Sequence, residues 1–218
     1  MPQEILPGIY QIEVDGPERM ATLPAKPEPV YGERIIGGYR IWDPFRSKLA
    51  ALLRKSGRIG LPGLSKESRI LYLGAATGTT VSHISDIVRD GVVYAVEVSP
   101  RSMRQFLVLC ESRDNIIPIL GDAARPKSYS SLVEPVDLLY QDVAQRNQAE
   151  IASSNSARYL RKGGTLILMI KSRSIDVTLS PQDVCRSEID KLKGLEVLHT
   201  IDLLPYHHDH RAVVAKKV

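Results

Sequence analysis

The chain has 218 residues, of which 43% are hydrophobic and 25% are charged, a composition that excludes intrinsic disorder and provides a sizeable core. Its 29 Lys and Arg against 25 Asp and Glu leave a formal charge of +4, too small an excess to indicate a nucleic-acid-binding protein by itself. No apolar run approaches the roughly 20 residues of a membrane helix, and the start lacks the apolar stretch of a secretory signal. Cys110 and Cys185 lie far apart without a CxxC pattern, so we expect no disulfide framework, no thiolate zinc site and a cytoplasmic location.

The positive charge is concentrated in one part of the chain. Residues 34–58 hold seven basic side chains and one acid, so this segment carries +6 while the rest of the chain carries −2. The seven basic residues are Arg34, Arg40, Arg46, Lys48, Arg54, Lys55 and Arg58. The kind of partner that this basic segment would bind depends on the chemistry of the neighbouring functional site.

Two domains of unequal size are expected. Residues 1–42 predict a small antiparallel β region, because short alternating stretches are separated by turn signals. Three prolines between positions 24 and 29 exclude a helix there. Residues 43–218 then form the larger domain.

The larger domain is predicted to open with a helix. Asp43 is the expected N-cap and Pro44 the first helical residue. The apolar stripe of this helix consists of Phe45, Leu49, Leu52 and Leu53. At about 100° per residue, Lys48 flanks that stripe and leans over the edge of a packed face.

From residue 69 onward, strands and helices alternate, which predicts a parallel sheet with helices on both faces. The last two strands are joined by a short polar corner, as in a hairpin. The predicted strands are 69–73, 92–98, 116–120, 136–140, 165–170, 195–203 and 212–217, and the predicted helices are 79–89, 100–112 and 148–160. Ligands of such sheets bind at the carboxyl ends of the strands, so the candidate site is sought there.

The carboxyl ends of the strands carry glycines and acids. A Gly-rich turn at 74–80 follows the first strand of the alternating region, and Glu97 ends the second. The G-x-x-x-G spacing differs from the dinucleotide fingerprint, and Asp122 and Asp142 end the next two strands. Acids at successive strand ends favour a cationic ligand such as S-adenosylmethionine over a pyrophosphate. The alternative, that each acid only caps the following helix, stays open at this point.

Five stretches together resemble the fibrillarin family over nearly the whole chain. They are Val30-Tyr-Gly-Glu33, Tyr39-Arg-Ile-Trp-Asp-Pro-Phe-Arg-Ser-Lys-Leu-Ala50, Leu71-Tyr-Leu-Gly-Ala-Ala-Thr-Gly-Thr-Thr80, Asp142-Val-Ala-Gln145 and Asp209-His210. Each stretch alone is only moderately specific, whereas the combination is highly specific. The sequence departs from the family at Asp43-Pro44-Phe45, where Asn-Pro-Tyr is usual, and at Arg211, where a smaller residue is usual. The Gly/Arg-rich tail of eukaryotic members is missing, so the chain resembles the short archaeal form.

The resemblance implies an α/β class I methyltransferase fold, Rossmann-like, with a mixed seven-stranded sheet. It also implies a cofactor site for S-adenosylmethionine and a Lys-Asp-Lys-His tetrad that matches Lys48, Asp142, Lys171 and His210. With the Gly-rich turn, the expected cofactor-binding residues are Gly74, Ala75, Gly78, Thr79, Thr80, Glu97, Val98, Asp122, Ala123, Asp142, Val143, Ala144 and Gln145.

The implied reaction is methyl transfer to a ribose 2′-hydroxyl of rRNA or tRNA. This displacement demands alignment and help with the hydroxyl proton, and it requires no metal. For Lys171 two roles stay open, namely accepting that proton and orienting the hydroxyl. The run His207-His208-Asp209-His210 invites a metal interpretation, but neighbours in an extended segment point to alternate faces, so we expect no metal site.

RNA contact is expected from the basic segment 34–58, helped by Arg173, as salt-sensitive binding with little sequence specificity. No base-stacking platform is expected, because only 12 residues are aromatic and the RRM signature is missing. Targeting would then come from the family's partners, a box C/D guide RNA, a Nop-domain scaffold protein and a kink-turn-binding protein. Two alternatives stay open: a protein glutamine methyltransferase, and a non-catalytic subunit of an RNA particle.

Overall fold

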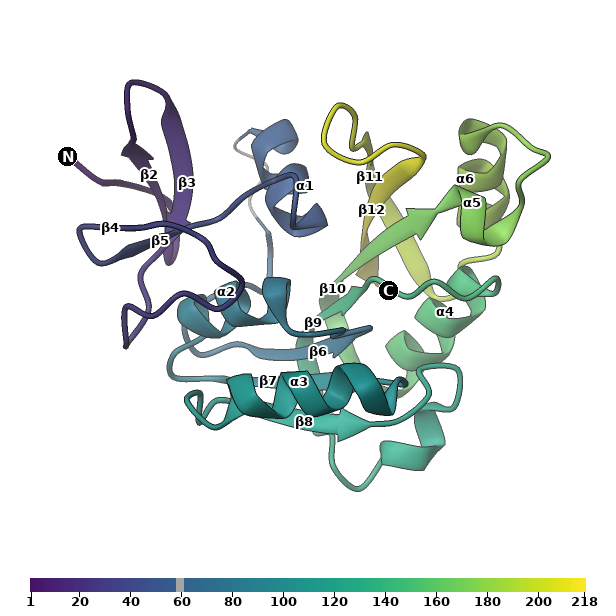
Figure 1. Ribbon diagram of the computed structural model, residues 1–218. Helices are drawn as coiled ribbons and strands as arrows, with labels where there is room; N and C mark the ends of the chain where they lie inside the picture. The colour runs from purple at the N-terminus through teal and green to yellow at the C-terminus, as the bar shows by residue number, and fades with distance from the viewer. Residues whose placement is uncertain (58–60) are drawn as a thin grey trace.

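A computed structural model describes residues 1–57 and 61–218. Arg58, one of the predicted RNA contacts, lies outside the described residues. Within the described part of the chain, no helix is long and apolar enough to cross a membrane. The chain forms two sheets, a small one near the N-terminus and a large one that carries the candidate site (Figure 1).

The N-terminal sheet has five antiparallel strands in the order β1-β2-β3-β5-β4. The strands are β1 (Gln3–Leu6), β2 (Ile9–Glu13), β3 (Glu18–Thr22), β4 (Ile35–Ile36) and β5 (Tyr39–Ile41). Ile12, Val14 and Ala21 form a small core of their own. The predicted antiparallel β region is therefore confirmed.

The large sheet has seven strands in the order β11-β12-β10-β9-β6-β7-β8. The strands β6 to β10 pair in parallel, and β12 is antiparallel to both of its neighbours, β10 and β11, so that one antiparallel strand lies in the sheet, as predicted for a mixed sheet. The strands are β6 (Arg69–Leu73), β7 (Val92–Glu97), β8 (Ile116–Leu120), β9 (Val136–Gln141), β10 (Leu160–Lys171), β11 (Leu195–Asp202) and β12 (His210–Lys217). β10 begins five residues earlier than the predicted 165, with a register irregularity between Leu160 and Thr165.

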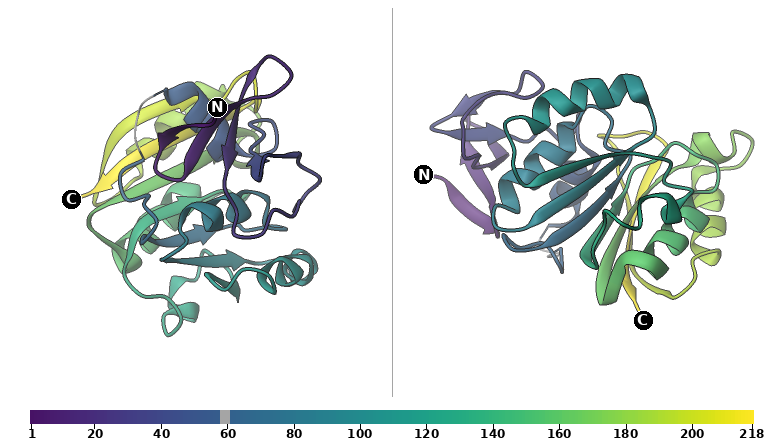
Figure 2. Two further views of the ribbon diagram at one scale, coloured as in Figure 1. Left: turned by 90° about the vertical axis from the view of Figure 1, so that its left-hand side faces the viewer. Right: turned by 90° about the horizontal axis from the view of Figure 1, so that it is seen from below.

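Helices cover both faces of the large sheet (Figure 2). They are α1 (Lys48–Ser56), α2 (Thr79–Ile87), α3 (Pro100–Cys110), η1 (Pro126–Tyr129), α4 (Gln148–Tyr159), α5 (Ser172–Ile175) and α6 (Pro181–Asp190). Apolar side chains of α1, α2 and α3 pack in one core cluster, and those of η1, α4 and α6 pack in the cluster of the opposite face. The sequence analysis missed η1, α5 and α6, although Ser180 as N-cap and Pro181 as first residue are signals for α6.

The predicted start of the first helix is wrong. α1 begins at Lys48, and the N-cap is Ser47, whose hydroxyl accepts the Ala50 amide at 3.3 Å. The Asp43 carboxylate accepts the Phe45 amide at 2.9 Å instead, which closes a local turn and keeps these residues out of the helix. Phe45 therefore leaves the apolar stripe, and it is 60% exposed.

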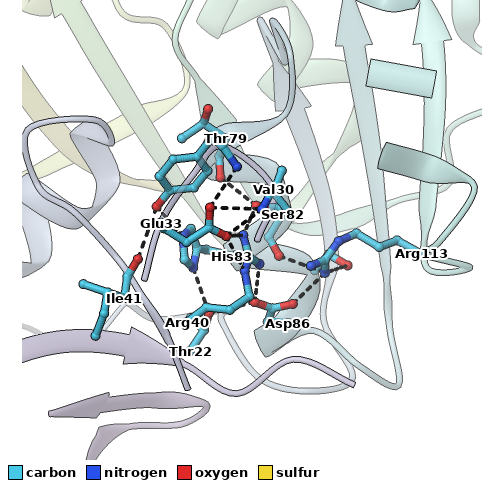
Figure 3. A network of polar contacts seen from close by, with 12 residues as sticks. Thr22, Val30, Glu33, Arg40, Ile41, Thr79, Ser82, His83, Asp86 and Arg113 are labelled. Atoms are coloured by element: carbon cyan, nitrogen blue, oxygen red, sulfur yellow. Dashed lines mark hydrogen bonds and ion pairs between the residues drawn. The ribbon is translucent and has the colours of Figure 1, made fainter. Parts of the chain in front are cut away.

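The prediction that Arg40 contacts RNA is also wrong. Its side chain is fully buried between β5 and α2, where it donates to Glu33 and Asp86 at 2.6 Å each and to Ser82 at 2.9 Å (Figure 3). A buried guanidinium is retained only where carboxylates and hydroxyls satisfy it, and this network does so. Arg40 joins the N-terminal sheet to the large domain and is closed to any partner.

His83 of α2 continues this network. Thr22 donates to Asp86 at 2.7 Å, so its hydroxyl accepts the Nδ1–H of His83, also at 2.7 Å, and His83 Nε2 accepts the Tyr31 hydroxyl at 2.7 Å. The imidazole stacks on Trp42 with ring centres 4.9 Å apart. Burial lowers the pKa of His83 well below its ordinary value, and the nearby guanidinium groups of the network act in the same direction. The histidine is therefore neutral.

Candidate active site

The turn after β6 brings the backbone of two strand ends into close contact. Gly74 has a φ of +88°, and a Cβ added to it would lie 2.6 Å from the Asp142 carbonyl oxygen. Gly78 has a φ of +93°, and an added Cβ would lie 2.4 Å from the Leu109 side chain. Only glycine fits at both positions. Because glycine has no side chain, the backbone of this turn stays accessible between α2 and the ends of the strands.

Glu97 and Asp122 lie at the carboxyl ends of adjacent strands. Glu97 accepts the Ala76 and Ser99 amides at 2.7 Å each, which ties the end of β7 to the glycine turn. Asp122 accepts the Gln145 side-chain amide and the Ala124 amide at 2.9 Å each, and these bonds lower the pKa of Asp122. Asp122 is thus held in the carboxylate form at the sheet edge, and Glu97 is fixed beside it by its two amide hydrogen bonds.

The alternative that the strand-end acids only cap the following helices does not hold. The residue at the N-cap of α3 is Ser99, that of η1 is Arg125 and that of α4 is Asn147. The acids therefore remain turned to the loops at the strand ends, where the negative charge suits a cationic ligand.

The side chain of Asp142 joins two lysines that lie far apart in the sequence. One carboxylate oxygen lies 3.1 Å from the Lys48 Nζ and the other 2.9 Å from the Lys171 Nζ. The Lys171 ammonium also donates to the Asp142 carbonyl at 3.0 Å. α1 supplies Lys48 at its first residue, Asp142 follows β9, and Lys171 ends β10, so the fold brings three of the four predicted residues into direct contact.

His210 completes the predicted tetrad at the start of β12, where it pairs with Lys171 in the strand register. Its Nδ1–H donates to the His208 carbonyl, so the neutral ring presents Nε2 as an acceptor. Burial lowers the pKa of His210, and the Lys48 and Lys171 ammonium groups act in the same direction, while the hydrogen bond to the His208 carbonyl and the Asp142 carboxylate oppose them; the net direction is downward. The imidazole at this edge is therefore a neutral proton acceptor.

Two contacts that sequence reasoning missed hold the tetrad in place. Gln148, fully buried at the start of α4, accepts the Lys171 amide at 3.0 Å and donates to the Gln145 carbonyl at 3.0 Å. The hydroxyl of Ser47, beside Lys48, lies 2.9 Å from that of Thr80 in α2. A buried glutamine at a helix start resembles any polar first-turn residue in the sequence, so no pattern pointed to it.

Other predicted cofactor residues lie on the loops at the strand ends or, as Thr79 and Thr80, in the first turn of α2. Ala75, Thr80, Ala123 and Val143 are buried behind the strand ends, and Val98 is 59% exposed at the rim. Gln145 has a buried Oε1 without a hydrogen-bond partner among the described residues. A buried acceptor left open beside the Asp122 carboxylate fits a ligand that carries amine hydrogens.

Most of the predicted RNA contacts are exposed. Arg46 donates to the Tyr31 carbonyl at 2.7 Å, and Arg34 pairs with Asp15 at 2.8 Å. Lys55 donates to the Leu204 carbonyl, Arg173 pairs with Asp209 at 3.1 Å, and Arg54 is exposed. Across residues 1–57 and 61–218 there is no group of three His, Cys, Asp or Glu side chains that could hold a metal ion.

The sequence profile of the fibrillarin family matches residues 1–218. The chain belongs to the fibrillarin family. A fibrillarin-like rRNA/tRNA 2′-O-methyltransferase of Methanothrix thermoacetophila is 56% identical over 216 residues, which cover 99% of each chain. The match therefore extends over the segments that form both sheets.

Two solved fibrillarin structures are close neighbours of this fibrillarin. The Aeropyrum pernix fibrillarin in complex with natively bound S-adenosyl-L-methionine superposes with a TM-score of 0.85 at 47% identity, covering 95% of this chain and 94% of that one. The fibrillarin of a fibrillarin/Nop5p complex superposes with a TM-score of 0.91 at 42% identity, covering 99% and 100%. The predicted α/β methyltransferase fold is confirmed.

Proposed function

We propose that this fibrillarin transfers a methyl group from S-adenosylmethionine to the ribose 2′-hydroxyl of rRNA and tRNA. The observation that carries the proposal is the contact of the Asp142 carboxylate with both Lys48 and Lys171 at the carboxyl edge of the sheet. The names of the curated relatives support the activity and the substrate class.

The strand ends fit S-adenosylmethionine. Glu97 is 7% exposed and already fixed by two amides, so its free lone pairs suit a pair of ribose hydroxyls. Asp122 and the open Gln145 Oε1 suit the adenine amine, and the glycine turn at 74–78 leaves room for close approach of the ligand to the backbone. When bound, S-adenosylmethionine supplies the methyl group as a sulfonium electrophile.

The four tetrad residues act on the ribose hydroxyl rather than on the methyl donor. The Asp142 carboxylate fixes the two ammonium groups of Lys48 and Lys171, whose remaining hydrogens can bind the ribose oxygen and hold it for attack. His210, neutral and with Nε2 open, is suited to take the proton that leaves the hydroxyl. In this proposal Lys171 orients the hydroxyl, and the His210 imidazole accepts its proton.

The partners follow from the same reasoning. A Nop-domain scaffold is supported by the fibrillarin/Nop5p complex, whose fibrillarin matches this chain over 99% of its length. We extend this to a box C/D guide RNA that selects the target and to a kink-turn-binding protein that holds the guide. Exposed arginines beside the tetrad suit a ribose-phosphate strand and carry no sequence information, so selection by a guide is required. The cytoplasmic location stays a prediction.

The test is reconstitution of the full chain with scaffold protein, kink-turn protein, guide RNA and a complementary target, followed by mapping of alkali-resistant 2′-O-methyl positions. We expect methylation at one guide-determined nucleotide, and none without the guide. Methylation of many sites by the chain alone would contradict guide dependence. Transfer to glutamine in a protein with none to RNA would favour the protein methyltransferase, and assembly without any transfer would favour the non-catalytic subunit.

A further inference from the structure

The four tetrad residues come from two different parts of the fold. Asp142 follows β9, Lys171 ends β10 and His210 begins β12, and these strands are neighbours in the sheet. Lys48 instead begins α1, a helix outside the sheet. The hydrogen-bond register of the strands therefore fixes three of the residues, whereas the position of Lys48 relative to His210 requires further contacts.

The corner that joins β11 to β12 supplies such contacts. It leads directly into His210 and lies beside α1 (Figure 1). Lys55, in the last turn of α1, donates to the Leu204 carbonyl of the corner. Before the helix begins, the Phe45 ring meets the Tyr206 ring edge to face, with ring centres 5.0 Å apart. The corner thus contacts both the helix and the segment that precedes it.

His207 makes a third contact, at the amino end of the helix. Its Nε2 lies 2.9 Å from the Pro44 carbonyl oxygen, and because a carbonyl only accepts hydrogen bonds, Nε2 carries the hydrogen. Pro44 lies four residues before Lys48, and the N-cap Ser47 lies between them. The bond therefore fixes the backbone just before the residue whose ammonium group contacts Asp142.

The backbone of the corner connects His207 firmly to His210. The His207 amide donates to the Leu203 carbonyl at 3.1 Å, and the Leu203 amide donates to the His210 carbonyl, also at 3.1 Å. The two imidazole rings lie with their centres 5.9 Å apart. The Asp209 carbonyl accepts the Ser172 amide at 3.1 Å, which ties the corner to the end of β10. His207 is thus fixed relative to His210, and its ring hydrogen bond extends this order to α1.

The ring of His207 is neutral. Burial lowers its pKa, and the Lys48 ammonium and His210 act in the same direction, while the hydrogen bond to the Pro44 carbonyl and the Asp142 carboxylate oppose them. The net direction is downward, so the ring carries no charge at neutral pH. A neutral donor connects the two segments without adding a positive charge beside the imidazole that is proposed to accept the proton.

We propose that His207 is a positioning residue for methyl transfer, which holds the amino end of α1, and with it the Lys48 ammonium, in place relative to His210. It does so through the hydrogen bond of its Nε2–H to the Pro44 carbonyl. It acts through Lys48 and His210 rather than by contact with the ribose. The inference rests on the proposed RNA methylation and adds one residue to it.

The test compares His207→Leu and His207→Gln in the reconstituted particle under single-turnover conditions. Glutamine offers an amide N–H in place of Nε2–H, whereas leucine keeps an apolar side chain and donates nothing. We expect the methyl-transfer rate to fall about tenfold in His207→Leu and to stay within about threefold of the wild type in His207→Gln, with the affinities for S-adenosylmethionine and RNA unchanged in both. His199→Leu, on the exposed strand β11, is the matched control and leaves the rate unchanged.

A second background separates positioning from a general loss of stability. In Lys48→Ala no ammonium group is left for His207 to position, so adding His207→Leu should lower the rate by less than about twofold. Equal losses in the wild-type and Lys48→Ala backgrounds would overturn the proposal. So would a wild-type rate in His207→Leu, or a rate in His207→Gln as low as that in His207→Leu.

An NMR titration of His210 in the isolated full chain gives a readout that needs no turnover. The nearby Lys48 ammonium lowers the pKa of His210, so loosening of α1 in His207→Leu should raise that pKa. His207→Gln should leave it unchanged, and this variant also controls for the loss of the second imidazole. If the wild-type particle does not methylate RNA, the proposed function fails, while the titration still decides the role of His207. An unchanged pKa of His210 in His207→Leu would overturn the proposal.

Discussion

Arg40→Met tests whether the buried network between the two sheets is a structural joint rather than an RNA contact. The substitution keeps the apolar stem and removes the guanidinium that bonds Glu33, Asp86 and Ser82. Removing one partner of a buried ion pair costs about 3–5 kcal/mol, because the remaining charge is left without compensation. Asp86 keeps Arg113 at 2.6 Å, so we expect the lower end, about 3 kcal/mol.

The assay is urea unfolding followed by circular dichroism. With an m-value of about 2–3 kcal/mol/M, the loss appears as a fall of about 1–1.5 M in the midpoint. Arg34→Met is the matched control, since Arg34 pairs with Asp15 at 2.8 Å but the two side chains are 62% and 75% exposed, and we expect a loss below about 1 kcal/mol. A loss in Arg40→Met no larger than that of the control would refute the reasoning.

Three further predictions concern the turn, the network and the tetrad. Gly74→Ala places a Cβ 2.6 Å from a backbone carbonyl at positive φ, so we expect lower thermal stability and at least about tenfold weaker S-adenosylmethionine binding by calorimetry. In the folded state the buried His83 stays neutral, whereas in the unfolded chain it is protonated below its ordinary pKa of 6.5. The contribution of His83 to folding stability is therefore fully present above pH 6.5 and is lost as the pH falls below it. This histidine alone should remove about 1.4 kcal/mol between pH 8 and pH 5.5 in urea unfolding, and His83→Asn should lose that component. Gln148→Leu releases the Lys171 amide, so we expect kcat for guided methylation to fall about tenfold while the KM for RNA is unchanged, and restoration of a polar bond in Gln148→Glu should recover part of it. Unchanged cofactor affinity in Gly74→Ala, an unchanged pH slope in His83→Asn, or an unchanged kcat in Gln148→Leu would count against the respective argument.

The sheet and the position of the site follow from the sequence because they depend on periodic patterns. Strand-helix alternation places the carboxyl ends of parallel strands at one edge, so Glu97, Asp122 and Asp142 had to lie together once the strands were identified. The glycine turn was found for the same reason, since Gly74 and Gly78 serve local backbone geometry that the sequence displays directly.

Features that depend on distant partners were not predictable in this way. Arg40 reads as one more cation of a basic segment, and only packing against α2 shows that it is buried between carboxylates. Asp43 and Ser47 both match N-cap signals. The Asp43 side chain closes a three-residue turn, so Ser47 becomes the N-cap of α1. The exposed ring of Phe45 follows from that turn, so its exposure could not be predicted either.

The role of the tetrad in methyl transfer is tested by single-turnover methylation with the reconstituted particle carrying Lys171→Ala. Lys171 touches Asp142 at the reacting edge, whereas Glu97 and Asp122, which fit the cofactor, lie on other loops. We expect a methyl-transfer rate at least about 100-fold below the wild type, with unchanged affinity for S-adenosylmethionine and RNA. A variant that methylates the guided nucleotide at the wild-type rate would contradict it.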